Sequence, residues 1–204
     1  MPDLSLERAC GTFPVAGVDE AGRGPWAGPV VAAAVILDES NLPDDLACRI
    51  DDSKAVARDE RAELFALLPL YALIGVGEAS VEEIDALNIL RATLLAMRRA
   101  VERLPLRPAV ALVDGNTRPD LPCAVRTVVA GDSLSLSIAA ASIVAKVTRD
   151  RRMAELTRTH PGYGWENNAG YGTSEHKQGL VRLGVTPYHR RSFRPISELL
   201  AVTY

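Results

Sequence analysis

The sequence has little cysteine and no long apolar run, and both absences narrow the classes of protein to which it can belong. Its 204 residues include three widely separated cysteines, Cys10, Cys48 and Cys123, with no Cys-x-x-Cys pair. This spacing argues against a disulfide framework and against a zinc site. No apolar run reaches the roughly 18 residues of a membrane span, and the first residues lack a basic-then-apolar signal pattern. We therefore expect a cytoplasmic protein with no membrane partner.

Lysine is also rare, and the basic side chains that are present are unevenly distributed. Residues 1–140 carry 13 basic and 21 acidic side chains, so their net charge is −8, although the whole chain has only −3. Residues 141–204 carry 10 basic and 5 acidic side chains, a net charge of +5. An acidic body beside a basic C-terminal third is typical of a protein that holds a polyanion next to carboxylates, although a solvated helical face would give the same count.

The apolar periodicity predicts alternating strands and helices around one core, since 48% of the residues are hydrophobic. The predicted strands cover residues 13–20, 28–37, 71–76, 109–114 and 125–129. The predicted helices cover residues 58–68, 81–104 and 135–157. Loops or irregular structure are predicted for residues 1–12 and 38–52, and glycine-rich turns with short helices from 160 onward.

The connections between these elements predict an α/β fold. The first three strands follow one another closely and should run antiparallel, whereas the last two alternate with helices and should run parallel to the first. The result is a mixed five-stranded sheet with helices on both faces. The last long helix begins with small residues, which would let it lie close to the sheet. In such sheets ligands gather at the carboxyl ends of the strands.

A glycine-rich turn follows the first predicted strand, which ends on two adjacent acids, Asp19 and Glu20. An isolated acidic pair at a strand end is usually a solvated turn. Here the pair precedes Gly22, Arg23 and Gly24, where glycine permits close backbone approach to a ligand and the guanidinium can bind phosphate. The glycine spacing does not match a dinucleotide-binding fingerprint. We expect both acids to reach one site only where the strand ends and its pleat relaxes.

Two further acids are predicted at the same edge of the sheet. Asp114 ends the fourth strand, and Asp132 lies between the fifth strand and the long helix. Taken singly, the first is typical of a turn and the second of a helix cap. Together with Asp19 and Glu20, however, they would repel one another unless a cation is bound. Oxygen ligands suit Mg²⁺ or Mn²⁺, and two such ions about 3.5–4 Å apart promote phosphodiester hydrolysis.

The basic C-terminal part contains two candidate contacts for nucleic acid. Tyr171 lies between glycines, so its ring can be presented for stacking on a sugar or base, or can anchor a surface loop. Residues 188–193 combine His189, Arg190 and Arg191 with aromatic neighbours, a composition suited to phosphate contact or to a solvated helix end.

These motifs resemble ribonuclease HII, the type 2 ribonuclease H, in order from about residue 13 to 195. The first motif is long and highly specific. The matching segments are Asp19-Glu20-Ala21-Gly22-Arg23-Gly24-Pro25, Ala27-Gly28-Pro29-Val30-Val31, Asp52-Ser53-Lys54, Val113-Asp114-Gly115-Asn116, Gly131-Asp132-Ser133, Ala140-Ala141-Ser142-Ile143, Ala145-Lys146-Val147, Arg149-Asp150, Gly170-Tyr171-Gly172-Thr173 and His189-Arg190-Arg191-Ser192-Phe193.

The resemblance implies a ribonuclease H-like catalytic domain over residues 13–158 and a C-terminal helical extension over 159–204 that contributes substrate contacts. It implies hydrolysis of the RNA strand of RNA/DNA hybrids and incision 5′ to single ribonucleotides in duplex DNA, as in ribonucleotide excision repair, by two-metal-ion catalysis that leaves a 3′-hydroxyl and a 5′-phosphate. Mg²⁺ or Mn²⁺ would be bound by Asp19, Glu20, Asp114 and Asp132. The implied substrate contacts are Gly22, Arg23, Gly24, Ser133, Lys146, Tyr171 and Arg190.

Two positions depart from the pattern of many relatives, because Ala130 and Ala169 stand where lysine is expected. Their loss of charge should weaken phosphate affinity without touching the metal ligands. Two alternatives stay open from the sequence: a nuclease of the same fold that acts on DNA alone, and a non-catalytic module that binds hybrids. We expect a monomer in each case.

Overall fold

Five strands form one mixed sheet in the order β3-β2-β1-β4-β5 in a computed structural model that describes residues 1–202. β1 pairs antiparallel with β2 and β2 with β3, whereas β1 pairs parallel with β4 and β4 with β5. The predicted α/β fold with a mixed five-stranded sheet is confirmed. The strands are β1 (Val15–Ala21), β2 (Val30–Leu37), β3 (Ala72–Ala79), β4 (Val110–Asp114) and β5 (Ala124–Val128).

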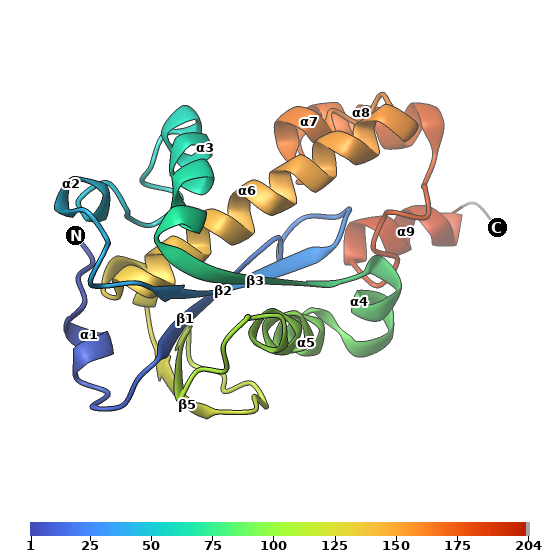
Figure 1. The fold of residues 1–204 in the computed structure, drawn as a ribbon. Coiled ribbons are helices and arrows are strands. Elements are labelled where there is room, and N and C mark those ends of the chain that lie inside the picture. The colour runs from blue at the N-terminus through green and yellow to red at the C-terminus, as the bar shows by residue number, and fades with distance from the viewer. Residues whose placement is uncertain (203–204) are drawn as a thin grey trace.

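Helices cover both faces of this sheet, with α6 on one side and α5 on the other (Figure 1). The helices of the first half are α1 (Ser5–Arg8), α2 (Asp44–Ala47), α3 (Arg58–Leu67), the 3₁₀ turn η1 (Leu68–Leu70), α4 (Val81–Leu87) and α5 (Ile89–Glu102). Those of the second half are the 3₁₀ turn η2 (Gly131–Ser133), α6 (Leu136–Thr159), α7 (Trp165–Asn168), α8 (Ser174–Leu183) and α9 (Arg194–Val202).

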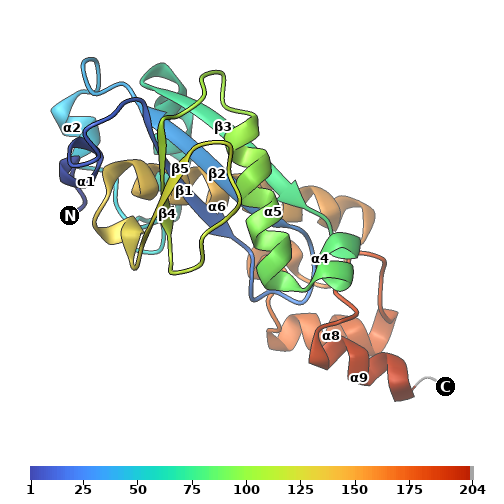
Figure 2. The ribbon, with the colours of Figure 1, turned by 90° about the horizontal axis from the view of Figure 1, so that it is seen from below.

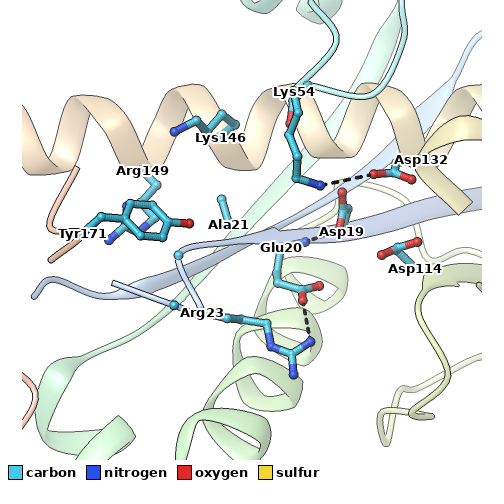
Figure 3. Close-up of a pocket in the computed structure, with 13 residues that line it drawn as sticks. Asp19, Glu20, Ala21, Arg23, Lys54, Asp114, Asp132, Lys146, Arg149 and Tyr171 are labelled. Carbon is cyan, nitrogen blue, oxygen red and sulfur yellow. Dashed lines mark hydrogen bonds and ion pairs between the residues drawn. The ribbon is translucent and has the colours of Figure 1, made fainter. Parts of the chain in front are cut away.

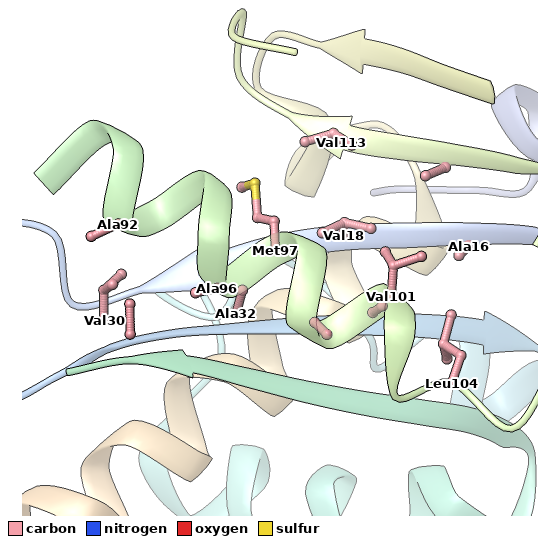
Figure 4. Close-up of a cluster of buried hydrophobic side chains, with 14 of the residues drawn as sticks. Ala16, Val18, Val30, Ala32, Ala92, Ala96, Met97, Val101, Leu104 and Val113 are labelled. Carbon is pink, nitrogen blue, oxygen red and sulfur yellow. The ribbon is translucent and has the colours of Figure 1, made fainter. Parts of the chain in front are cut away.

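α5 packs on its face of the sheet through a stripe of small side chains at four-residue spacing. Figure 2 shows α5 lying across the strands. Ala92, Ala96 and Ala100 are fully buried, and Met97 and Val101 pack beside them in the same cluster (Figure 4). Residues four apart lie on the same side of a helix, so this stripe faces the strands along the whole length of α5.

α6 lies so close to the opposite face that its N-terminal part leaves no room for a side chain on β1. A Cβ atom at Gly17 would come within 2.1 Å of the backbone carbon of Ser137. The alanines at 139–141 are fully buried in the same layer. The expectation that small residues let this helix approach the sheet is confirmed, and the close contact holds α6 against the central strand.

Three segments differ from the sequence prediction. The helix predicted over 81–104 is divided into α4 and α5 at Asn88, which has a φ of 72° and accepts a hydrogen bond from the backbone N–H of Arg91. A left-handed residue ends one helix, and its side chain caps the next. Residues 1–12 contain α1 and pair with the start of α6 through Asp3. Residues 38–52 contain α2, a single helical turn.

α6 continues beyond the sheet and carries the C-terminal helices on its far end (Figure 1). A separate apolar cluster forms there around Met153, Tyr163, Trp165, Leu180 and Ile196. The expected boundary between residues 158 and 159 falls at the end of α6. Within residues 1–202, no helix is both long and apolar enough to cross a membrane.

A buried pair of histidines ties this C-terminal cluster together. His176 and His189 are fully buried, and their Nε2 atoms lie 3.0 Å apart. The Nδ1 atom of His189 accepts hydrogen bonds from the backbone N–H and the hydroxyl of Thr186, so its Nε2 atom must carry the proton and donate to His176. His176 also accepts from the indole N–H of Trp165 and donates through Nδ1 to the carbonyl of Tyr171. The network is complete only when both rings are neutral.

Acid is expected to destabilise the protein through this pair. Burial, together with the neighbouring His176, lowers the pKa of His189 to about 4, whereas an unfolded histidine titrates near 6.5. Between these values the unfolded chain binds more protons, so stability is lost as pH falls from about 6.5 to 4, by up to about 3 kcal/mol. Melting temperature measured across this range checks the prediction. A His189→Asn variant should melt with a flatter pH dependence, and an equal slope in both proteins would contradict it.

Candidate active site

A pocket opens at the edge of the sheet where the carboxyl ends of β1 and β4 meet η2 (Figure 3). Because β1 and β4 are parallel neighbours, their ends reach the same edge. The residues that line it come from the ends of β1 and β4, the β1–β2 turn, the loop before α3, η2, α6 and the loop after α7. They are Asp19, Glu20, Ala21, Gly22, Arg23, Gly24, Ser53, Lys54, Asp114, Asp132, Lys146, Arg149 and Tyr171.

The two adjacent acids lie on β1 within the regular ladder, which continues through Ala21. The expected relaxation of the pleat at Glu20 is therefore wrong, and the two side chains leave opposite sides of the strand (Figure 3). Both still line the pocket because β1 ends at its floor. Asp19 is only 6% exposed, and its carboxylate accepts the backbone N–H of Glu20 at 2.7 Å. Glu20 points toward Arg23, 3.1 Å from its guanidinium.

Asp114, the last residue of β4, and Asp132, in η2, approach the same pocket from neighbouring elements. The Oδ1 atom of Asp114 accepts the backbone N–H of Gly131 at 2.7 Å, which ties the end of β4 to the turn that carries Asp132. The Oδ2 atom of Asp132 lies 3.8 Å from the ammonium of Lys54. The four predicted acids thus lie at one end of a single pocket, as the sheet topology predicted.

The electrostatics of these acids reflect their burial and their mutual repulsion. Burial, then the charges of Glu20 and Asp114, raise the pKa of Asp19 well above its usual value. Burial also raises the pKa values of Glu20 and Asp132. Burial of Lys54 lowers its pKa, but the surrounding carboxylates outweigh this effect and the pKa is raised. Since the Lys54 side chain is 81% exposed, it only partly compensates the acidic charge.

The chemistry of the donors fits a hard divalent cation, because all four side chains line one pocket with carboxylate oxygens and little compensating charge. Within residues 1–202, no three histidine, cysteine, aspartate or glutamate side chains converge closely enough to hold an ion as they stand. Binding would therefore require rotation of these side chains. A bound cation would offset both the burial and the mutual repulsion that raise the pKa of Asp19.

The other end of the pocket is formed by the turn at Gly22–Gly24 and by Tyr171, whose ring is 48% exposed (Figure 3). Lys146 also lines the pocket, where its ammonium lies 2.8 Å from the Asp150 carboxylate. The backbone N–H groups of residues 22–24 donate to no backbone carbonyl in the part of the chain that the structure describes. They are thus available to a ligand.

Two predicted contacts lie outside the pocket. Ser133 is exposed on η2 and donates its hydroxyl to the carbonyl of Ala130. Arg190 is fully buried beneath the β1–β2 turn, where its guanidinium donates to the carbonyls of Gly22, Arg23, Gly28 and Pro29 at 2.6–3.2 Å. The predicted direct contact between Arg190 and the substrate therefore does not fit this geometry. Its hydrogen bonds hold the turn from below.

Arg149, which the sequence analysis did not single out, supports the same turn from α6. Its guanidinium donates to the carbonyls of Ala27, Pro29 and Ala169, and a Cβ atom at Gly22 would lie 1.9 Å from its Nε atom. Burial lowers the pKa of Arg149 to about 10 and that of Arg190 to about 9. Neither forms an ion pair within residues 1–202. All of their hydrogen bonds go to backbone carbonyls, and the Arg190 guanidinium also lies over the Phe193 ring, 5.0 Å from its centroid.

Lys54 also lines the pocket, although the sequence analysis did not select it as a site residue. It is the only lysine in the first 140 residues. It follows Asp52 and Ser53 in one of the segments that match the family, and this match was the signal that could have identified it.

Ala130 and Ala169, which stand where lysine was expected, have φ values of 53° and 47° in the loops that carry Asp132 and Tyr171. Left-handed backbone is unfavourable for alanine, so both loops hold some strain beside the pocket.

Comparisons with known proteins match this chain to one family over nearly its whole length. The profile of the family described as Ribonuclease HII matches residues 16–196. The ribonuclease HII of Paramagnetospirillum magneticum is 62% identical over 200 residues, which cover 98% of this chain and 99% of that protein. That of Rhodospirillum rubrum is 61% identical over 203 residues, which cover 98% of this chain and 93% of that protein.

Solved structures show the same architecture. The ribonuclease H2 of Pyrococcus horikoshii OT3 superposes with a TM-score of 0.76 at 28% identity, covering 92% of this chain and 97% of that one. Bst-RNase HIII in complex with Mn²⁺ has a TM-score of 0.76 at 18% identity, covering 99% of this chain and 74% of that one, which shows a shared fold. The chain belongs to the ribonuclease HII family, hydrolases that cleave RNA in RNA/DNA hybrids.

Proposed function

We propose that this enzyme, besides cleaving RNA in hybrids, incises duplex DNA on the 5′ side of a single embedded ribonucleotide. The observation that carries the proposal is the juxtaposition, in one pocket, of four acids at one end with the Gly22–Gly24 turn and Tyr171 at the other. The acidic end suits phosphodiester hydrolysis, and the other end suits recognition of a sugar. A site that reads one ribose and the next deoxyribose does not need a long RNA strand.

Asp19, Glu20, Asp114 and Asp132 would hold the metal, Mg²⁺ or Mn²⁺. Two ions bound there would stabilise the charge that develops on the phosphate and lower the pKa of water, so that in-line attack leaves a 3′-hydroxyl and a 5′-phosphate. Lys54, already beside Asp132, places an exposed ammonium where it can neutralise a phosphate of the scissile strand. Lys54 would thereby help to hold the scissile strand over the four acids.

Recognition would come from the backbone and one aromatic ring. The free N–H groups of residues 22–24 can donate to the ribose 2′-hydroxyl and the adjoining phosphate. Arg23 keeps half of its side chain exposed while paired with Glu20, so it can also reach a phosphate. Tyr171 would stack on the following deoxyribose. The C-terminal region over 159–204 would contribute this ring and nearby basic side chains, and a monomer would suffice because one chain lines the whole pocket.

Cleavage of a DNA duplex with one ribonucleotide tests the proposal. The reactions contain Mg²⁺, Mn²⁺ or a chelator, with an all-DNA duplex and a long RNA/DNA hybrid alongside. One metal-dependent cut 5′ to the ribonucleotide, with the all-DNA duplex intact, is the expected result. Cleavage of the hybrid alone would refute the single-ribonucleotide activity. Cleavage of the all-DNA duplex would favour a DNA-directed nuclease, and metal-independent binding without cleavage a hybrid-binding module.

Tyr171→Ala is expected to impair junction recognition more than hydrolysis. Loss of one stacking contact of about 1–3 kcal/mol should reduce kcat/KM on the single-ribonucleotide duplex about 10- to 100-fold. Long hybrids offer many equivalent positions, so the loss there should be smaller. Val181→Ala, an exposed change on the nearby α8, serves as the control. Equal losses on both substrates would show that the ring does not sense the junction.

A further inference from the structure

A buried acid outside the pocket joins the N-terminal segment to the start of α6. Glu7 is only 4% exposed on α1. Its Oε1 atom accepts hydrogen bonds from the hydroxyls of Ser135 and Ser137, both at 2.6 Å, and from the backbone N–H of Ser137 at 2.9 Å. Its Oε2 atom has no hydrogen-bond partner within residues 1–202. Burying a carboxylate this deeply with only one oxygen satisfied costs free energy, so its place in the fold calls for an explanation.

The backbone of the same segment pairs with the chain just ahead of α6. Asp3 forms a parallel bridge with Ser135, accepts the N–H of Leu136 at 2.9 Å and donates its own N–H to the carbonyl of Leu134 at 3.3 Å. Residues 3–7 therefore hold residues 134–137 through both backbone and side chain. We call these two stretches together the N-terminal clamp.

The second stretch of the clamp, residues 134–137, follows immediately after the turn that carries Asp132. The backbone N–H of Ser135 donates to the carbonyl of Gly131 at 2.8 Å, so η2 closes directly onto the clamped residues. On its other side, Gly131 donates to the carboxylate of Asp114. The turn with Asp132 is thus fixed between β4 and the clamp, and it does not contact Glu7 itself.

Capping of α6 accounts for only part of what Glu7 does: Ser135 accepts the first-turn N–H of Ile138 at 3.2 Å, and Glu7 accepts that of Ser137 at 2.9 Å. What the carboxylate adds is a link between α1 and both serine hydroxyls. Its negative charge also faces the positive end of the 24-residue helix α6. Removing it would free the hydroxyls and loosen the chain between Gly131 and Ser137.

We propose that Glu7 is a positioning residue that orients Asp132 for metal binding by anchoring the η2–α6 junction to the N-terminal segment. The inference rests on the proposed function only in taking Asp132 as a metal ligand. Its consequence is specific: the clamp governs affinity for the ion and leaves contacts with the nucleic acid unchanged.

Glu7→Ala is expected to weaken Mn²⁺ binding about 10-fold by calorimetry, to lower kcat by a similar factor, and to leave KM for the hybrid within about twofold. Amide hydrogen exchange over residues 131–137 should accelerate at the same time. Glu7→Gln keeps an oxygen acceptor for the serines and should recover most of the affinity. Arg8→Ala, on the same short helix but exposed and paired with Glu39, should behave like the unmodified protein.

Val101→Ala separates this role from a general loss of stability, since it removes core volume from α5 on the opposite face of the sheet. If it lowers the melting temperature as much as Glu7→Ala but leaves Mn²⁺ affinity unchanged, the proposal stands. Equal effects of both variants on Mn²⁺ affinity and on exchange over residues 131–137 would overturn it. Absence of ribonucleotide cleavage by the unmodified protein would count against the proposed function alone, because calorimetry and exchange do not depend on turnover.

Discussion

Asp114→Asn is expected to lower the rate of strand cleavage by about 1,000-fold or more while the protein stays folded. The amide keeps an oxygen at the position that accepts the N–H of Gly131, so the link between β4 and η2 survives. What is lost is one negative charge from the set that would hold the metal. Because the charge of Asp114 contributes to the raised pKa of Asp19, its removal should leave thermal stability unchanged or slightly higher.

Single-turnover cleavage of a hybrid in Mg²⁺, together with melting temperature, checks this prediction. Asp120→Asn is the matched control, because that carboxylate is 94% exposed and pairs only at the surface with Arg98. It should cleave at the normal rate. Full turnover by Asp114→Asn would remove Asp114 from the metal site. A large fall in its melting temperature would mean that its hydrogen bond, and not its charge, is what the fold requires.

Arg190→Met is expected to have the second largest effect, because it removes the support of the substrate-binding turn. Methionine fills part of the volume but donates no hydrogen bond, which leaves the carbonyls of Gly22, Arg23 and Gly28 without this partner. Such unsatisfied buried groups should destabilise the protein by about 2–4 kcal/mol. Since the turn carries the N–H groups proposed to contact the ribose, KM should rise about 10-fold or more, with a smaller fall in kcat.

Measuring KM and kcat separately for Arg190→Met distinguishes two causes. Loss of support for the turn should mainly raise KM, whereas damage to the metal site should mainly lower kcat. Arg190→Lys keeps the charge, which the backbone carbonyls accommodate, but its single ammonium cannot reach all of the acceptors. It should therefore rescue stability more than KM. Arg194→Ala, an exposed arginine paired with Glu198, is the control and should change neither quantity. Unchanged KM for Arg190→Met would refute the supporting role.

Local patterns in the chain predicted much of this molecule. Short apolar runs identified all five strands, because each strand is short and bounded by glycine, proline or acids. The order of strands and helices then determined their directions, which brought Asp19, Glu20, Asp114 and Asp132 to one edge of the sheet. Tyr171 was found because its flanking glycines leave the ring no helical face to pack against. In each case the residues that determine the local structure lie within a few positions of the pattern that predicted it.

Long-range packing decided what local patterns did not reveal. Arg190 stands in a basic stretch that is typical of phosphate contact, yet the β1–β2 turn, more than 160 residues earlier, covers it with carbonyls. Glu7 belongs to a segment with no periodicity, and only the serines at the start of α6 explain its burial. The division at Asn88 depends on a left-handed backbone that helix periodicity does not encode.

The sequence by itself thus determined the sheet, the four acids and the family, since these follow from short-range periodicity, strand direction and motifs. The tertiary structure alone decided which charged side chains support the pocket and which line it. That distinction depends on partners distant in the chain, because a buried guanidinium or carboxylate is held by whichever backbone groups the fold brings to it.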